Sequence, residues 1–129
     1  MNVHCFDTSA LVEITHAGLN AAKFAQALAK AETVIISTVS IYEIARYTTH
    51  AAGETATAEI LAFLHQYRIT PVTVEIAELA ATLAPRHKLA MADAIIYATT
   101  KTQNATLWTQ DEDFEGLPHV KYYPKIRPS

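Results

Sequence analysis

Five acidic residues in this chain lie at positions where a carboxylate could take part in chemistry. Asp7 directly follows the apolar run VHCF, and Glu43 lies in a helical segment that follows the apolar run TVIIS. Asp111 and Asp113 follow a third run, ATLWT. Asp93 is the only charge in the segment LAMADAIIYATT, so we expect it to be partly buried. A lone buried carboxylate is costly, so this position needs an explanation.

Several carboxylates gathered at one place would repel each other and take up protons unless a cation lay among them. The sequence has no cluster of cysteines and no H-x-x-x-H pattern, which gives little support to a zinc site. Carboxylates without thiols suit Mg²⁺ or Mn²⁺, which also take phosphate oxygens as ligands. Such ions activate water and neutralise the charge that builds up on a phosphoryl group. The acids therefore predict a site for phosphoryl chemistry if the fold brings them together.

Each acid also has a purely structural explanation. Asp7 could cap the helix that follows it, and Glu43 could form a capping box with Ser40. Asp93 could complement the dipole of its own helix, and the acids after ATLWT could form a turn. Taken singly these explanations are at least as good as a site, but taken together they weaken.

The apolar pattern predicts the elements that must position these residues. Continuous β-branched runs are typical of buried parallel strands, which we expect at 3–6, 33–37, 68–72, 105–109 and 120–123. Pro71 places the third of these at an edge of the sheet. Helical spacing predicts helices at 10–18, 21–31, 38–52, 55–67, 74–84 and 90–102, with breaks at Gly53 and at 85–88.

Alternation of strands and helices predicts an α/β fold. We expect a three-layer α/β/α sandwich with a central, mostly parallel sheet of about four to five short strands, forming a single domain over 1–129. In such sheets, sites form at the carboxyl ends of the strands. All the acids named above could then meet at one rim.

Composition bounds the function further. The chain has 129 residues, half of them hydrophobic and 18% charged, which is typical of a globular domain with a core. We expect no membrane segment and no signal peptide, and the single cysteine, Cys5, suits a cytoplasmic location. The net charge of −3 is unusual for a protein that binds nucleic acid by bulk electrostatics. A substrate that carries phosphates would need metal ions or a local basic strip.

Four segments in order resemble the PIN-domain nucleases and, within them, the VapC-like toxins of bacterial and archaeal toxin–antitoxin pairs. They are DTSALV at 7–12, VSIYEI at 39–44, MADAII at 91–96 and LWTQDEDF at 107–114, with GLP before the last strand. The resemblance runs nearly end to end, so it implies a PIN-like domain over 1–129. Each segment alone is weak, but the four in this order and spacing are specific.

The resemblance implies a Mg²⁺- or Mn²⁺-dependent endoribonuclease that leaves 5′-phosphate and 3′-hydroxyl ends. It also implies that Asp7, Glu43, Asp93 and Asp111 form an acidic catalytic quartet. Asp7 and Asp93 would be the firmest metal ligands, and Asp111 would ligate a second ion or position water for it. Glu43 would ligate metal or orient the attacking water, and Asp113 is the alternative to Asp111 as the fourth acid.

The resemblance also implies partners and further contacts: an RNA substrate, a homodimer and a small antitoxin protein that blocks the acidic groove. Thr8, Ser9 and Thr109 match hydroxyls near the family's site and would order the loop or touch phosphate. Arg46 lies three residues after Glu43 and could either reach substrate phosphate or pair with Glu43.

The remaining candidates for chemistry are less specific. The basic turn at 86–88 is expected to be solvated, and Trp108 and the tyrosines are expected in the core or an interface. The histidines lack the spacing of metal ligands and are expected to be structural or exposed: His4, His16, His50, His65, His87 and His119. Two other functions stay open, namely another metal-dependent phosphoryl hydrolase and a non-catalytic binding domain.

Overall fold

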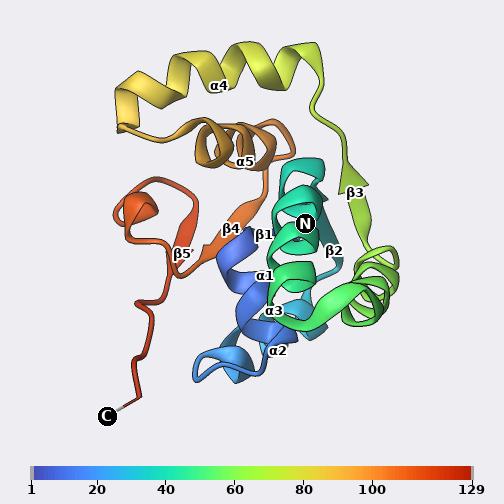
Figure 1. Cartoon of the computed structure of the whole chain (residues 1–129). Coiled ribbons are helices and arrows are strands. Elements are labelled where there is room, and N and C mark those ends of the chain that lie inside the picture. The colour runs from blue at the N-terminus through green and yellow to red at the C-terminus, as the bar shows by residue number, and fades with distance from the viewer. Residues whose placement is uncertain (1, 129) are drawn as a thin grey trace.

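The computed structural model describes residues 2–128, so Met1 and Ser129, the ends of the predicted domain, lie outside the described residues. A five-stranded sheet runs through its centre in the order β3-β2-β1-β4-β5, and every neighbouring pair is parallel. The strands are β1 (Val3–Phe6), β2 (Thr33–Ser37), β3 (Arg68–Thr70), β4 (Thr106–Thr109) and β5 (Val120–Tyr122). The prediction of a mostly parallel sheet between helical layers is confirmed (Figure 1).

The helices cover both faces of this sheet (Figure 1). They are α1 (Thr8–Thr15), α2 (Ala21–Lys30), α3 (Thr38–Leu64), α4 (Val74–His87) and α5 (Met91–Thr102), with a short 3₁₀ turn, η1 (Glu112–Phe114). Along β1, Cys5 packs in one hydrophobic cluster with α4 and α5, while its neighbour Phe6 packs in a second cluster with α1, α2 and α3. This alternation follows from the two-residue period of a strand, which sends successive side chains to opposite faces.

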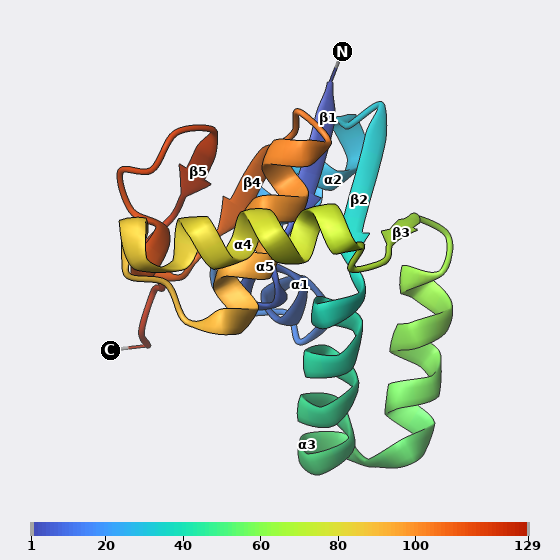
Figure 2. The same ribbon diagram turned by 90° about the horizontal axis from the view of Figure 1, so that it is seen from above.

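Gly53 divides α3 into two arms, as the sequence predicts. Its φ of 90° and ψ of 177° are not helical, and such a combination is open essentially to glycine alone. The two arms fold back beside each other as a helical hairpin (Figure 2), and a hydrogen bond of 2.7 Å joins the hydroxyls of Thr49 and Thr57 across them. The break therefore changes the direction of the chain without ending the helical pattern.

Two local predictions are wrong. Helix α4 does not end at Ala84 but continues through Pro85 to His87, so Arg86 and His87 belong to its last turn. A proline there removes only one hydrogen bond near the end of a helix, and the stop comes at Lys88, which has a left-handed φ of 57°. The second error concerns Asn20: its place before the helix predicted at 21–31 predicts an N-cap, but its side chain forms no cap hydrogen bond with α2.

The aromatic residues divide into packed and exposed groups. Trp108 stacks on Phe6 and Tyr123, and its indole N–H donates to Nδ1 of His4 at 2.8 Å. Tyr42 and Tyr47, on the first arm of α3, are instead 64% and 48% exposed. No helix within residues 2–128 is long and apolar enough to cross a membrane.

Candidate functional site

The acidic residues gather where the order of the strands reverses. From β1 the chain builds outward to β2 and β3 on one side, and it then returns to place β4 and β5 on the other side. Ligands of parallel sheets bind in the crevice outside the carboxyl ends of the strands at such a reversal. Asp7 directly follows β1, and Asp111 lies two residues beyond the end of its neighbour β4.

Asp7 is held rigidly at the end of β1. Its side chain is 3% exposed, and Oδ1 accepts hydrogen bonds from the backbone N–H of Ala10 at 2.9 Å and from the Ser9 hydroxyl at 2.7 Å. Oδ2 accepts a hydrogen bond from the Thr109 hydroxyl at 2.5 Å. The first of these bonds caps α1, so Asp7 does cap a helix. The two hydroxyl bonds go beyond what a cap requires and fix the direction of the carboxylate.

Hydroxyl groups extend this network to the loop after β4. The backbone N–H of Gln110 donates to the Ser9 hydroxyl at 2.9 Å, and the N–H of Asp111 donates to the Thr109 hydroxyl at 2.9 Å. Asp111 in turn accepts from the N–H of Asp113 at 2.9 Å, which caps η1. The ends of β1 and β4 are therefore joined through side chains, and the position of Asp111 depends on that of Asp7.

Phe114 anchors the same loop to the core. Its ring is fully buried in the cluster of α4 and α5 and packs near Tyr97, and Leu117 packs against that cluster. The acids Glu112 and Glu115 on either side of Asp113 and Phe114 are exposed. The buried ring explains why the four acids of this loop are not equivalent.

Glu43 reaches the site from α3 through a contact with α1. The Thr8 hydroxyl donates to Oε1 of Glu43 at 2.5 Å and lies 3.2 Å from the Ser40 hydroxyl. The residue that caps α3 is Ser37, whose hydroxyl accepts from the N–H of Val39. Because the helix begins directly after β2, Ser40 is already inside it, and the capping-box explanation of Glu43 is wrong.

Asp93 completes the group from the first turn of α5. Oxygen atoms of Asp93, Asp111 and Asp113 all lie within 4.8 Å of one another. Asp93 is half-buried and Asp113 is exposed. This trio includes the alternative acid Asp113 but not Asp7. The charge of Asp7 still acts on Asp93, and both oxygens of Asp7 already accept hydrogen bonds from the protein.

Two of the acids, Asp7 and Asp93, have raised pKa values. The pKa of Asp93 is raised from 3.8 to about 7, first by burial and then by the negative charges of Asp111, Asp7, Glu43 and Asp113, in that order. Burial also raises the pKa of Asp7 to about 6, against the lowering effect of its hydrogen bonds from Thr109, Ala10 and Ser9. The charges that act on Asp93 come from the other four carboxylates, which therefore lie near it. A donor set made of carboxylate oxygens fits a hard divalent cation.

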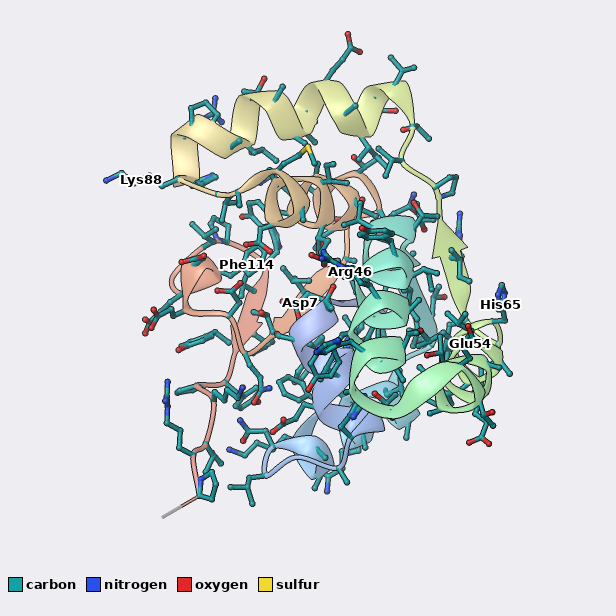
Figure 3. All side chains as sticks on the ribbon, in the orientation of Figure 1. Asp7, Arg46, Glu54, His65, Lys88 and Phe114 are labelled. Atoms are coloured by element: carbon teal, nitrogen blue, oxygen red, sulfur yellow. The ribbon has the colours of Figure 1, made fainter. Side chains whose placement is uncertain are left out.

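The other predicted residues lie around this group. Thr8, Ser9 and Thr109 are all part of the hydrogen-bond network, two of them at the start of α1 and one at the end of β4. Arg46 is exposed on α3, and the hydrogen-bond partner described for Glu43 is Thr8. Figure 3 shows Asp7 and Arg46 in the region bounded by α1, α3 and α5.

Sequence reasoning missed one residue of the network, Gln110. Its backbone donates to Ser9, and its side chain is buried and accepts a hydrogen bond of 2.8 Å from Asn20. Its place directly after β4, at the same strand end as Asp111, is the signal that could have found it.

The family model of the PIN domain matches residues 4–120 of the sequence. The chain belongs to the PIN-domain family. The match spans all four motif segments and both strand ends that carry the acids, so the family extends over the whole candidate site.

Solved structures of toxins and toxin–antitoxin complexes share this fold along nearly the full chain. A toxin–antitoxin complex from Klebsiella pneumoniae contains a chain that is 27% identical, with a TM-score of 0.81, over 94% of this chain and 98% of that one. VapC20 from Mycobacterium tuberculosis, a toxin that cleaves the sarcin–ricin loop, is 20% identical, with a TM-score of 0.76, over 97% and 99%. VapBC2 from Rickettsia felis, bound to a promoter DNA fragment, is 18% identical, with a TM-score of 0.76, over 94% and 98%.

No curated protein sequence matches this chain significantly. The family and the fold therefore rest on the PIN-domain model and on the solved structures. Both point to the fold of the VapC-type PIN proteins, as the sequence resemblance predicts.

Proposed function

We propose that this PIN-domain protein is a Mg²⁺- or Mn²⁺-dependent endoribonuclease and the toxin of a toxin–antitoxin pair. One observation carries the proposal: carboxylates from four elements converge at the strand reversal, and the charges that shift the pKa of Asp93 are all negative. Such a group is unfavourable unless a divalent cation joins it. If these acids served only to cap helices and form turns, there would be no reason for them to converge at one place.

Asp93, Asp111 and Asp113 would hold the cation, and Asp7 would hold it or a second one from the end of β1. When bound, such an ion lowers the pKa of water and neutralises charge on the phosphoryl group under attack. The hydrogen bonds from Ser9 and Thr109 keep the Asp7 carboxylate in place before any ion arrives. This fixed position reduces the ordering that metal binding would otherwise require.

Glu43 would orient the attacking water. Its Oε1 already accepts the hydrogen bond from Thr8, which fixes the side chain and leaves Oε2 to accept a proton or a hydrogen bond from water. Arg46, one turn further along α3, would bind a phosphate of the substrate. Attack of water on the phosphodiester would give 5′-phosphate and 3′-hydroxyl ends.

We also propose a homodimer, located in the cytoplasm, that a small antitoxin protein inhibits. The Klebsiella pneumoniae relative was solved as a toxin–antitoxin complex, and the Rickettsia felis relative as VapBC2 on promoter DNA. The long coverage of both chains supports the same kind of partner for this protein.

Cleavage of RNA tests this function directly. The protein with Mg²⁺ or Mn²⁺ should cut RNA and leave 5′-phosphate and 3′-hydroxyl ends, and EDTA should abolish the reaction. Asp93→Asn should abolish it as well, with an unchanged circular dichroism spectrum as the control for folding. Cleavage that persists in EDTA and leaves 2′,3′-cyclic phosphates would show that the proposal is wrong.

A further inference from the structure

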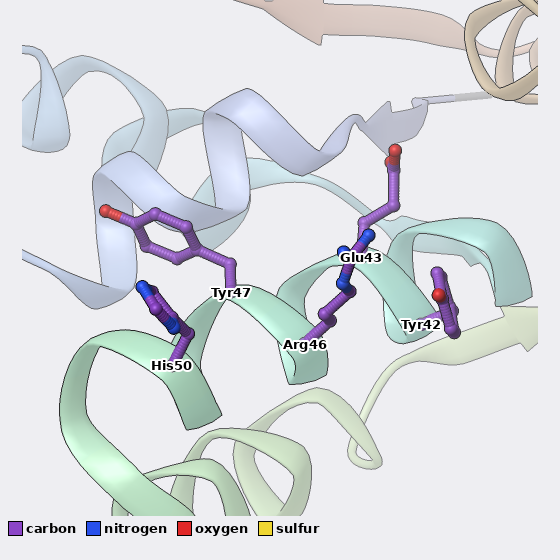
Figure 4. A pocket seen from close by; sticks show the side chains of 5 residues that line it. All are labelled: Tyr42, Glu43, Arg46, Tyr47 and His50. Carbon is purple, nitrogen blue, oxygen red and sulfur yellow. The ribbon is translucent and has the colours of Figure 1, made fainter.

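An aromatic and basic surface continues from the candidate site along the first arm of α3. A surface cavity of about 480 Å³ is lined by Tyr42, Glu43, Arg46, Tyr47 and His50 (Figure 4). Glu43 belongs to the acidic group and points toward the junction of β1 and α1, where it meets Thr8. The other four residues extend the surface beyond the acids. We call these four, Tyr42, Arg46, Tyr47 and His50, the α3 strip.

The composition of the α3 strip is unusual for an exposed helix. Tyr42 is 64% and Tyr47 48% exposed, and Arg46 and His50 are exposed beside them. Aromatic rings and arginine are the side chains on which unpaired bases stack. Arg46 places a positive charge beside Glu43 in the lining of the same cavity, although the protein carries a net charge of −3.

The ring of Tyr47 is held in place by contacts with α1. His16 makes a T-shaped contact with it, with ring centroids 5.2 Å apart, and Nε2 of His16 lies 3.4 Å from the hydroxyl of Thr48. A ring that is already ordered loses less conformational entropy when it binds a ligand. Tyr47 is thus both exposed and fixed, as a stacking platform requires.

The length and direction of the strip match a short segment of single-stranded nucleic acid. Glu43 and His50 are seven positions apart in one helix, which at about 1.5 Å per residue is about 10 Å. Stacked nucleotides rise about 3.4 Å each, so this length holds about three of them. The segment would leave the acidic group at Glu43 and run toward His50.

We propose that the α3 strip binds the single-stranded RNA that flanks the scissile phosphodiester, by stacking bases on Tyr42 and Tyr47 and binding backbone phosphates through Arg46 and His50. The proposal rests on the ribonuclease function for its substrate and extends it to an unpaired strand about three nucleotides long. It also gives the acidic protein a local basic strip for its polyanionic substrate.

The surface could in principle receive a segment of a protein instead. Two observations favour RNA. The strip is continuous with the acids through Glu43, which lines the same cavity. Arg46 and His50 alternate along one helix with the two tyrosines, so that hydrogen-bond donors and rings lie within reach of one strand.

Fluorescence anisotropy of a labelled RNA tests the proposal. The probe is a single-stranded RNA of mixed sequence, about 12 nucleotides long, in Mg²⁺. All proteins carry Asp93→Asn to prevent cleavage. We expect Tyr42→Leu and Tyr47→Leu each to weaken binding about 10-fold, because each removes a stacking ring while keeping an apolar side chain. Tyr47→Phe keeps the ring and should bind within about twofold of the parent.

A matched pair of exposed histidines, one inside the α3 strip and one outside it, controls for a general effect of removing a histidine. His50→Ala should weaken binding, whereas His65→Ala, which changes an exposed histidine at the far end of α3 (Figure 3), should not. The same RNA in a duplex should bind more weakly than the single strand, because its bases cannot reach the rings. Circular dichroism of each variant confirms that the fold is kept.

The proposal is overturned if Tyr42→Leu and Tyr47→Leu leave RNA binding unchanged, or if His65→Ala weakens it as much as His50→Ala. It is also overturned if the leucine variants keep full RNA binding but no longer bind a co-expressed antitoxin, since the surface would then be a docking site for a protein. Failure of the nuclease function is a separate result: the parent chain without Asp93→Asn would not cleave RNA, whatever the tyrosine variants do to binding.

Discussion

Asp7 should lower the stability of the metal-free protein at neutral pH, and Asp7→Asn should reverse this effect. The carboxylate is buried at the end of β1, and burial raises its pKa from 3.8 to about 6. Asparagine has the same shape: its oxygen can accept from Ala10 and Ser9, and its amide can donate to the hydroxyl oxygen of Thr109. The substitution therefore removes the charge and keeps the hydrogen bonds.

The size and sign of the effect follow from the pKa. An aspartate in the unfolded chain has a pKa of about 3.9, so the folded protein holds this proton more tightly. The free energy of unfolding is then highest below about pH 4, falls as the pH rises, and has lost this contribution above about pH 6. Since each pKa unit is worth about 1.4 kcal/mol, the rise from 3.8 to about 6 corresponds to about 3 kcal/mol. Asp7→Asn should not show this loss.

Urea unfolding in EDTA measures the prediction at about pH 4 and about pH 8. The difference in unfolding free energy between Asp7→Asn and the parent should shift in favour of the variant by about 3 kcal/mol between the two. Removal of the Asp7 charge also relieves Asp93, whose pKa it raises, and this adds in the same direction. Glu112→Gln, which changes an exposed acid of the η1 loop, is the matched control and should give no such shift. A difference for Asp7→Asn that is the same at both pH values would refute the reasoning.

Addition of metal should reverse the order of stability of the parent and Asp7→Asn. A ligand at 100 times its dissociation constant stabilises the folded state by about 2.7 kcal/mol. The parent should gain this from Mg²⁺ or Mn²⁺ at about pH 8, while Asp7→Asn should gain less because one carboxylate is gone. A variant that is more stable without metal and less stabilised by it would identify Asp7 as part of a cation site.

Three further predictions concern Asp111, Thr109 and Gly53. Asp111→Asn should abolish cleavage of a labelled RNA in Mg²⁺, whereas Glu112→Gln should keep it within about twofold, because only the first acid belongs to the trio; cleavage lost only in Asp113→Asn would instead make Asp113 the fourth acid. Thr109→Val should slow cleavage at least about 10-fold and move the pH dependence of stability to higher pH. The hydrogen bond from Thr109 lowers the pKa of Asp7, so its removal should raise that pKa further. An unchanged pH profile of urea unfolding would contradict this. Gly53→Ala should lower the free energy of unfolding in urea by about 1–3 kcal/mol, because φ is 90° there, while RNA cleavage is kept.

The sequence alone predicts the strands and the place of the acids well, for a physical reason. Runs such as TVIIS are buried on both faces, so their apolar continuity does not depend on distant partners. Each acid is then placed by its distance from a strand end, and a parallel sheet brings those ends to one rim. Gly53 was predictable for a similar reason, since its effect is set by its own backbone.

The errors concern residues whose partners are far away in the sequence. The side chain of Asn20 does not cap α2 but donates to Gln110 and to the carbonyl of Pro124, both about a hundred residues away. Asp113 joins Asp93 because η1 turns its side chain back toward α5, and this turn depends on the buried ring of Phe114. The spacing of residues along the sequence cannot predict either of these contacts, so the sequence does not decide whether Asp111 or Asp113 is the fourth acid.

The same network links the fold, the metal and the proton. Asp7 is held by three hydrogen bonds, whereas Asp113 is exposed and rests on a short turn. Burial therefore destabilises the charged form of the rigid acid, Asp7, whereas the exposed acid, Asp113, can move to meet an incoming cation. Because a proton and a metal ion compete for the same oxygens, the raised pKa values of Asp7 and Asp93 would make the affinity of the proposed site for a metal ion depend on pH near neutrality. The features that make the metal-free site unstable are thus those that would make it selective for a divalent cation.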